Sequence, residues 1–354
     1  MGWPNLNGRP RKRDSILSID LGSHTTKAVH LMRRGDRFAL AGYVIRDAPS
    51  GDQPLDPATL GEHIREICQS LDPKTRRAIV SLGVHESILR NAEMPQVPVS
   101  EMRQMLKVGT QTYLQQELPN HAFDCYVTTQ RQDPTKPESG KFNGKFKVWV
   151  GAAPNKVVNA VQNALKSAGF AADSITPGML GPVNAFEAAF PETFQNEVVA
   201  LVDLGFKNTS ISILNHGDLV VNRVVALGGD TLTTSLAEMV GVGYAEAEGI
   251  KIGMPQEVEH ALLPVLRSLG RELRASVDFF ETQNDQPVST VYLSGGAARS
   301  DFFIQSLQSD LMLPCKAWNP AAFLESELPQ NQADDLEQLA PRLAVAIGAA
   351  TTLV

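Results

Sequence analysis

The sequence predicts an α/β protein with two lobes of related design, because one strand-rich unit occurs twice along its 354 residues. In each copy a strand ends in Asp-Leu-Gly, a second strand follows a short turn, and a Gly-Asp turn leads into a third strand. The first copy covers residues 15–45 and the second covers residues 198–227. Two copies in nearly the same register favour a duplicated structural unit over a chance likeness.

Each strand-rich unit is followed by a segment with helical periodicity. After the first unit, residues 56–68 place Leu60, Ile64 and Ile67 on one predicted helix face. After the second unit, Asp230 is a predicted N-cap. The apolar residues that share one face of that second helix are Leu232, Leu236, Met239 and Val240. A later amphipathic helix is predicted over residues 264–283.

A separate module is predicted between the two lobes. Its patterns predict a strand, a helix, two strands around a polar loop, and a last helix, which is the order βαββα. These elements are expected at residues 88–94, after Ser100, at 123–129 and 146–153, and from Pro154 to about Gly169. The module therefore replaces a simple connection between the lobes.

These boundaries divide the chain into six predicted segments. They are a basic flexible tail (1–14), a first lobe (15–84), an inserted partner-binding module (85–172), a connecting segment of the first lobe (173–197), a second lobe (198–340) and a C-terminal connecting helix on the first lobe (341–354). The tail carries four cations near its end, which favours a solubilising segment over a membrane anchor because it has no apolar face.

Composition excludes several classes of protein. The net charge of −7 gives no electrostatic basis for nucleic-acid binding. Cys68, Cys125 and Cys315 have no paired spacing, which argues against a disulfide framework or a zinc site and favours a reducing cytoplasm. No apolar run approaches the roughly 18 to 20 residues that a membrane span needs. We therefore expect a cytoplasmic protein without a direct membrane span.

The two Asp-Leu-Gly turns have the chemistry of a polyphosphate site. Glycine lets backbone amides approach phosphate oxygens closely. Asp20 and Asp203 would face the same phosphates, where their charges require a cation, so we expect Mg²⁺ held largely through water. Lys27 would add positive charge. Ser23, Thr25 and Thr26 offer hydroxyl donors.

A structural interpretation competes with this one, because a single Asp-x-Gly is often only a strand end that turns through glycine. The duplication and the downstream motifs favour the functional interpretation. At this point the chain resembles the superfamily of actin, heat-shock chaperones and sugar kinases. The matching motifs are two phosphate segments (Asp20–Lys27 and Asp203–Ser210), an adenosine segment (Val291–Ala298) and two connecting helices (Gly181–Phe186 and Leu343–Ala350).

Two further segments are similar to the FtsA/PilM branch of the actin-like ATPases. They are Arg223–Asp230, with its Gly-Gly pair, and Ala247–Lys251, with its Ala-Glu-x-x-Lys pattern. The chain ends directly after the second connecting helix, without a basic amphipathic tail, which resembles the PilM family more than FtsA. The resemblance implies an actin-like (ribonuclease H-like) fold with two lobes and an inserted FtsA/PilM-type βαββα module.

The resemblance also implies a site for ATP or ADP with Mg. The residues expected to contact the nucleotide are Asp20, Gly22, Ser23, Thr25, Thr26, Lys27, Asp203, Gly205, Asn208, Thr209, Gly228, Gly229, Glu248, Lys251, Gly295 and Gly296. Phe206, Lys207 and Asn208 depart from the small or hydroxyl residues usual in the second phosphate segment. No residue outside the phosphate segments presents itself as a general base, so at most slow ATP hydrolysis is expected.

As a function, the resemblance implies a cytoplasmic ATP-binding scaffold of type IV pilus assembly, peripheral to the inner membrane. Its inserted module would bind the N-terminal cytoplasmic peptide of a bitopic inner-membrane protein (PilN-like), and the scaffold would contact pilus motor proteins and could form oligomers. One alternative is a sugar or small-molecule kinase, which needs a catalytic aspartate such as Asp173 or Asp230. Another is an FtsA-like or secretion-platform scaffold without nucleotide turnover.

Overall fold

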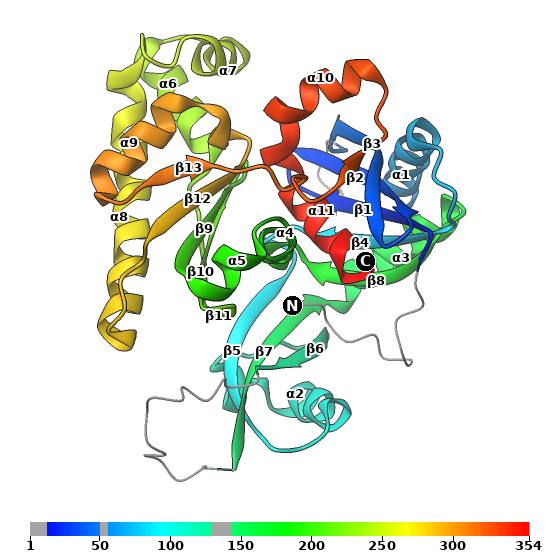
Figure 1. Ribbon diagram of the computed structural model, residues 1–354. Helices are drawn as coiled ribbons and strands as arrows, with labels where there is room; N and C mark the ends of the chain where they lie inside the picture. Colours follow the sequence, from blue (N-terminus) through cyan, green and yellow to red (C-terminus); the bar gives the residue numbers. More distant parts are fainter. Residues whose placement is uncertain (1–12, 50–55, 129–143, 354) are drawn as a thin grey trace.

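The chain folds into two α/β lobes side by side, with a smaller module below them (Figure 1). The computed structural model describes residues 13–49, 56–128 and 144–353. The predicted basic tail over residues 1–14 lies almost wholly outside the described residues. The two predicted lobes are present, and the elements between them follow the predicted order β, α, β, β, α, although the last helix packs on the first lobe.

The first lobe is built on a six-stranded sheet with the order β14-β3-β2-β1-β4-β8. Its strands are β1 (Ser15–Leu21), β2 (Thr25–Arg34), β3 (Arg37–Asp47), β4 (Arg77–Leu82), β8 (Ala171–Pro177) and β14 (Glu325–Ser326). Helix α1 (Pro57–Leu71) covers one face, and Asp56 caps it by accepting the Thr59 amide. The other face packs on α11 (Ala344–Ala350), which crosses α4 (Gly181–Ala189).

The second lobe repeats this plan with a five-stranded sheet in the order β11-β10-β9-β12-β13. Its strands are β9 (Val198–Leu204), β10 (Thr209–Asn215), β11 (Asp218–Val225), β12 (Thr290–Gly295) and β13 (Cys315–Ala317). Its helices are α6 (Gly229–Val240), α7 (Tyr244–Gly253), α8 (Glu259–Asn284) and α9 (Asp301–Leu311). Among the described helices, none is both long and apolar enough to cross a bilayer.

The internal repeat predicted from the sequence corresponds to equivalent strands in the two sheets. Strands β1 and β2 are antiparallel with Asp20 opposite Lys27, and β9 and β10 are antiparallel with Asp203 opposite Ser210. On their other side, β1 pairs with β4 and β9 pairs with β12, and both of these pairs are parallel. The two Asp-Leu-Gly turns therefore lie at the same corner of two related sheets.

The inserted module has a three-stranded antiparallel sheet in the order β5-β7-β6, with α2 (Val99–Leu114) on one face. The strands are β5 (Ile88–Pro95), β6 (His121–Val127) and β7 (Lys145–Pro154). The other face meets the second lobe, because Trp149 is buried and its indole N–H donates to the carbonyl of Leu219 at 3.0 Å. The module thus contacts both lobes.

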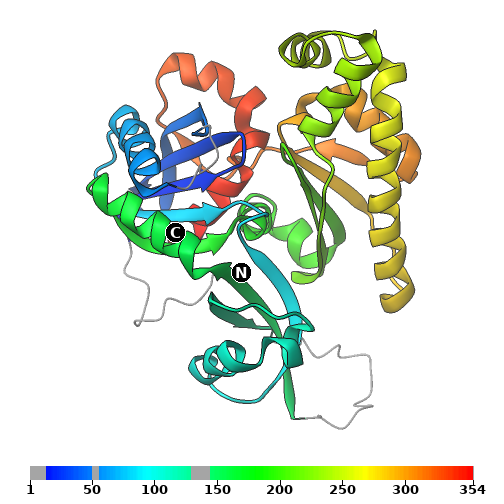
Figure 2. The same cartoon turned by 180° about the vertical axis from the view of Figure 1, so that it is seen from behind.

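Helix α3 (Asn155–Ser167) differs from its predicted place in the inserted module. Its apolar residues Val157, Val161 and Leu165 join the core beneath the first sheet, where α3 packs along α1. Figure 2, seen from behind, shows α3 beside the first lobe and away from α2. The physical reason is that the module's sheet already has α2 on one face and the second lobe on the other.

The boundary predicted at residue 340 is also displaced. The chain returns to the first lobe after β13, because Glu325 and Ser326 pair with Ala39 and Leu40 of β3. Helix α10 (Gln330–Leu339) follows there, and the Tyr43 hydroxyl donates to the carbonyl of Gln332 at 3.1 Å. A two-residue strand leaves no periodic pattern in the sequence, so this return could not be predicted.

Helix α6 begins at Gly229 with Gly228 at the N-cap, not at Asp230 as predicted. The Asp230 carboxylate instead accepts the Tyr244 hydroxyl at 2.7 Å. Leu232 and Leu236 are buried as predicted, whereas Met239 and Val240 are exposed. The periodicity therefore identified the helix but extended its buried face one turn too far.

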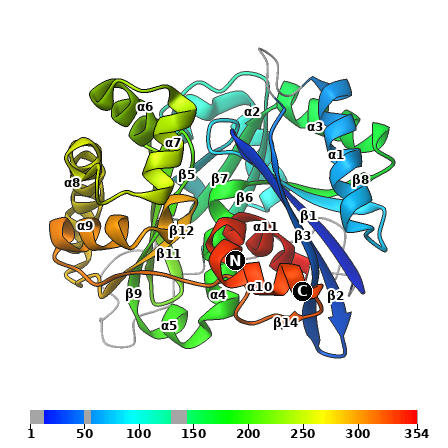
Figure 3. The same cartoon turned by 90° about the horizontal axis from the view of Figure 1, so that it is seen from above.

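The two lobes are joined by the crossing of α4 and α11, which lie between the sheets in the view from above (Figure 3). A Cβ atom on Gly348 would lie 1.7 Å from the carbonyl oxygen of Gly181 and 2.9 Å from the amide of Ala185. A Cβ atom on Gly181 would lie 2.5 Å from the Cα of Val345. The helices touch backbone to backbone, and only glycine permits this contact.

Replacing Gly348 with alanine should destabilise the protein by about 1–3 kcal/mol or more, because the helices must separate to admit the methyl group. Denaturant unfolding followed by circular dichroism measures this. Gly249→Ala in α7 is the matched control, because its added Cβ meets no atom within 4 Å. That control should stabilise by about 0.5–1 kcal/mol. Equal effects of the two substitutions would contradict the crossing geometry.

Candidate nucleotide and partner sites

The first phosphate hairpin brings Asp20 and Lys27 together at the end of β1. Lys27 Nζ lies 3.2 Å from Asp20 Oδ2, and Asp20 is only 5% exposed. The turn between them closes tightly, because a Cβ atom on Gly22 would lie 2.6 Å from the carbonyl oxygen of Thr25. Ser23 is exposed at the tip of the turn. The predicted charges are thus presented at one corner of the first sheet.

The second hairpin places Asp203 at the end of β9, where its carboxylate accepts the Ser294 hydroxyl at 2.8 Å. Its turn is as tight as the first, because a Cβ atom on Gly205 would lie 2.6 Å from the carbonyl oxygen of Asn208. Ser294 was not predicted as a site residue. Its position directly before Gly295 and Gly296, at the end of an apolar strand, was the available signal.

The two hairpins come close enough for their charges to interact. Burial raises the pKa of Asp203, whereas the Ser294 hydrogen bond and the Lys27 charge lower it, and the Asp20 charge raises it further. Lys27 and Asp20 belong to the first lobe and Asp203 to the second, so these interactions act between the lobes. A cation between the carboxylates would favour the ionised form of Asp203.

These carboxylates fit the water-mediated Mg²⁺ expected from the sequence. Among the described residues there is no cluster of three or more His, Cys, Asp or Glu side chains that could coordinate a metal directly. Two carboxylates facing one cleft suit an ion that keeps most of its waters and is also held by substrate phosphates. Asp20 and Asp203 are therefore the residues that would hold it.

Two predicted contacts do not face the cleft. Thr26 is 1% exposed and its hydroxyl lies 2.9 Å from Nε2 of His63 in α1. Thr209 is fully buried and donates to the carbonyl of Leu227 at 2.7 Å. Successive side chains alternate between the faces of a strand, so Thr26 lies on the face opposite Lys27. Each hydroxyl contacts a group of its own lobe and therefore does not face the proposed phosphate site.

The Gly228–Gly229 pair also acts on the second hairpin. The amides of Gly229 and Asp230 donate to the carbonyls of Gly205 and Phe206 at 3.0 and 2.8 Å. A Cβ atom on Gly228 would lie 2.3 Å from the Phe206 carbonyl oxygen. The N-terminus of α6 therefore holds the hairpin in place, and these two amides are already occupied by protein acceptors.

Glu248 and Lys251 form a partly enclosed cluster on the second lobe. Lys251 is 8% exposed and donates to Glu248 at 2.6 Å, to Thr233 at 2.6 Å and to the Gly229 carbonyl at 3.2 Å. Burial of the lysine excludes the interpretation of Glu248 and Lys251 as a simple surface pair. Thr233, which the sequence analysis missed, links α6 to α7 through this cluster.

The predicted adenosine segment ends beside Asp203. Gly295 has a φ of +90°, and a Cβ atom there would lie 2.3 Å from the Leu204 carbonyl oxygen. The Gly296 amide donates to the same carbonyl at 3.1 Å, while the space around its own Cβ position is open. Only glycine fits at position 295. The open space beside Gly296 leaves room for a ligand next to the second hairpin.

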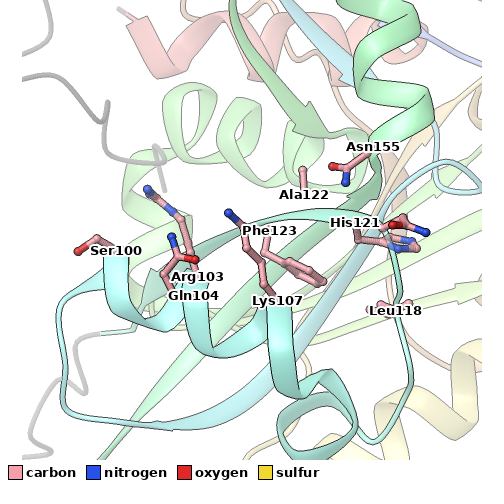
Figure 4. Close-up of a pocket in the computed structure, with 10 residues that line it drawn as sticks. Ser100, Arg103, Gln104, Lys107, Leu118, His121, Ala122, Phe123 and Asn155 are labelled. Carbon is pink, nitrogen blue, oxygen red and sulfur yellow. The ribbon is translucent and has the colours of Figure 1, made fainter.

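A second candidate site lies on the inserted module, at a groove of about 600 Å³. Figure 4 shows α2 presenting Arg103, Gln104 and Lys107 along one side, with β6 and the start of α3 opposite. Phe123 and Leu118 add apolar surface. Arg103 is held by Asp124 at 2.7 Å, so one cation of the groove is fixed in position. The sequence predicted partner binding by the module but indicated no groove residues.

The comparisons with known proteins identify the family. A family model described as type IV pilus assembly protein PilM matches residues 18–352. The chain belongs to this PilM family. The cell division protein FtsA of Bacillus subtilis (strain 168) is 23% identical over 253 residues, which are 66% of this chain and 57% of FtsA. The predicted relation to the FtsA/PilM branch is therefore confirmed.

Solved structures confirm the predicted actin-like fold. The chain resembles the PilM-PilN type IV pilus biogenesis complex with a TM-score of 0.81 and 24% identity, over 96% of this chain and 98% of that one. It resembles the ethanolamine utilization protein EutJ of Carboxydothermus hydrogenoformans with a TM-score of 0.56 and 15% identity, over 97% and 91%. For MreB5 of Spiroplasma citri bound to AMPPNP the values are 0.51 and 13%, over 96% and 95%.

Two buried histidines should make the first lobe sensitive to acid. Burial and the charge of Arg46 lower the pKa of His63, and burial and Lys74 lower that of His30. Nearby Glu66 and Asp72 oppose these effects. The unfolded chain therefore binds more protons than the folded chain, and this stability is lost as pH falls below the ordinary value of 6.5 toward the folded pKa.

Replacing His63 with Gln should reduce the slope of the free energy of unfolding against pH between about pH 7 and 5. The reduction should be up to about 1.4 kcal/mol per pH unit. Chemical denaturation at a series of pH values measures the slope. The same substitution at His260, which is exposed on α8, is the control. An identical slope in wild type and His63→Gln would show that His63 does not remain neutral in the folded protein.

Proposed function

We propose that this member of the PilM family is an actin-like ATP-binding scaffold of type IV pilus assembly. It binds ATP or ADP with Mg²⁺ between its lobes and docks a peptide of an inner-membrane partner on its inserted module. The observation that carries the proposal is the pairing of the Asp20–Lys27 and Asp203–Ser294 corners across the interlobe cleft. Bound nucleotide would bias the approach of the two lobes, as a population shift.

The nucleotide site of the proposal keeps most of the predicted residues. Asp20, Lys27 and Asp203 supply the charges, and the turns at Gly22 and Gly205 bring backbone to the phosphates. Ser23, Thr25 and Asn208 remain proposed phosphate contacts. Thr26, Thr209, Gly228 and Gly229 support the hairpins, and Glu248, Lys251, Gly295 and Gly296 would border the ribose and adenine. Any hydrolysis is proposed to be slow.

The kinase alternative loses its two candidate bases. Asp173 is engaged by Arg13 at 3.0 Å and by Arg77, at the outer strand of the first sheet. Asp230 accepts the Tyr244 hydroxyl. A general base must be free to take a proton from a substrate hydroxyl, and these carboxylates are committed to other partners. This favours the scaffold over the kinase.

For the partner site, we propose the groove between α2 and β6. Strand β6 is an edge strand, and the Asn155 amide donates to the Asn120 carbonyl. The backbone N–H and C=O groups of the even-numbered β6 residues therefore point toward β7. Those of His121, Phe123 and Val127 point toward the open edge. An extended peptide can add to such an edge, while Lys107 offers a donor for its oxygens.

The partner proposed for this groove is the N-terminal cytoplasmic peptide of a PilN-like bitopic protein. The solved PilM-PilN complex, which the chain resembles in fold, supports this partner class. Such a partner would hold the scaffold at the cytoplasmic side of the inner membrane. Contacts with pilus motor proteins and oligomerisation remain part of the proposal.

Asp20→Ala and Lys27→Ala should each weaken Mg·ATP binding by about ten- to a hundredfold, because each removes a charged contact near the phosphates. Isothermal titration calorimetry measures the affinity. Lys145→Ala, which removes one positive charge from the inserted module, is the control and should bind like wild type. Unchanged affinity in both site variants would sink the nucleotide assignment.

Lys107→Ala and Phe123→Ala should each weaken binding of the synthetic N-terminal peptide of the PilN homologue from the same genome by at least about tenfold. Fluorescence anisotropy of the labelled peptide measures this. Val108→Ala is the matched control, because Val108 is 90% exposed beside Lys107 and does not line the groove. If the control and the groove variants bind equally well, the peptide lies elsewhere.

A further inference from the structure

The tips of the two phosphate hairpins touch through one pair of aromatic rings. His24 of the first hairpin and Phe206 of the second are stacked, with ring centroids 4.0 Å apart and planes inclined by 13°. One ring belongs to each lobe. Rings at this separation are in van der Waals contact, so no phosphate group fits between them.

Each ring is carried by a turn that its own lobe fixes. The carbonyl of His24 accepts the Ala48 amide at 2.8 Å, at the end of β3. The carbonyl of Phe206 accepts the Asp230 amide at 2.8 Å, at the start of α6. Movement of either turn backbone would therefore break a backbone hydrogen bond, so the rings separate through rotation of a side chain or through movement of the lobes.

The stack lies outside the charged corners of the cleft. His24 is exposed, whereas Asp20, at the inner end of the same hairpin, is 5% exposed. In the second hairpin, Phe206 likewise comes after the aspartate, three residues beyond Asp203. A polyphosphate that enters between the hairpin tips therefore meets the stacked rings before it reaches the two aspartates.

We propose that His24 and Phe206 form a latch across the phosphate side of the cleft, which must open for a nucleoside polyphosphate to enter or leave. This inference rests on the proposed nucleotide function. It assigns Phe206, an unusual residue in the second phosphate segment, to the control of exchange and not to phosphate binding. The α4–α11 crossing joins the lobes that the latch ties together.

Stopped-flow fluorescence with N-methylanthraniloyl-ADP and its ATP counterpart tests the latch in the full chain. His24→Ala and Phe206→Ala should each raise both the association and the dissociation rate constants by about two- to tenfold, the range expected for one lost aromatic pair. The double variant should be no faster than either single variant, because both remove the same contact. Phe206→Tyr, which keeps the ring, should retain the slow rates.

Phe279→Ala is the control, because it removes an aromatic ring that is 56% exposed on α8, outside both phosphate hairpins. Wild-type rates in both alanine variants, or additive effects in the double variant, would overturn the latch. Unfolding is excluded by the circular dichroism spectrum of each variant. A wild-type chain that binds neither nucleotide would instead refute the proposed function.

A second measurement needs no nucleotide. The double variant His24→Cys/Phe206→Cys should be joined by a short bifunctional thiol reagent in the nucleotide-free protein. The native thiols compete poorly, because Cys68, Cys125 and Cys315 are buried and burial raises their pKa values to about 12, about 12 and about 11. Failure of the cross-link, with each single-cysteine variant labelled normally, would show that the hairpin tips do not meet.

Discussion

The backbone contact between α4 and α11 sets the separation of the two lobes, and the nucleotide site depends on that separation. Gly181 and Gly348 let the helices approach until carbonyl and Cα atoms touch. Each helix packs under one of the related sheets, so the crossing fixes how far apart the corners with Asp20 and Asp203 lie. Near their tips, the phosphate hairpins contact each other through the stacked rings of His24 and Phe206.

In this arrangement, the negative charges of Asp203 and Asp20 are not fully compensated by the protein. Asp203 is disfavoured as an anion by burial and by the charge of Asp20, and Lys27 and Ser294 compensate only in part. In the proposed function, a cation and a polyphosphate would bring the missing charges, and their binding free energy would draw the lobes together. The hydrogen bond from the Trp149 indole to the Leu219 carbonyl joins the inserted module to the second lobe, so the proposed partner groove would follow a movement of that lobe.

Much of the fold could be predicted because the repeat, the glycine turns and the helical periodicities each act locally. The displaced parts depend on tertiary packing. Helix α3 joined the first lobe because the faces of the module's sheet were already covered, and residues 325–340 returned to that lobe through a strand of two residues. Met239 and Val240 continued an apolar pattern past the point where α6 leaves the core.

The duplicated Asp-Leu-Gly turns predicted the charged residues of the proposed site, whereas the phosphate contacts predicted for the Thr26 and Thr209 hydroxyls do not agree with the structure. Thr26 and Thr209 occupy equivalent positions in the two hairpins and both face the core, as strand alternation counted from Lys27 would have indicated. Ser294 and Thr233 act through partners distant in sequence, which only the folded chain brings together.

Hydrogen exchange with and without Mg·ATP would show whether one nucleotide is held by both lobes. This arrangement predicts that residues 20–27 and 203–209 gain protection together, at the same ligand concentration, because one polyphosphate would contact both hairpins. Protection of one hairpin without the other, or of neither, would contradict it.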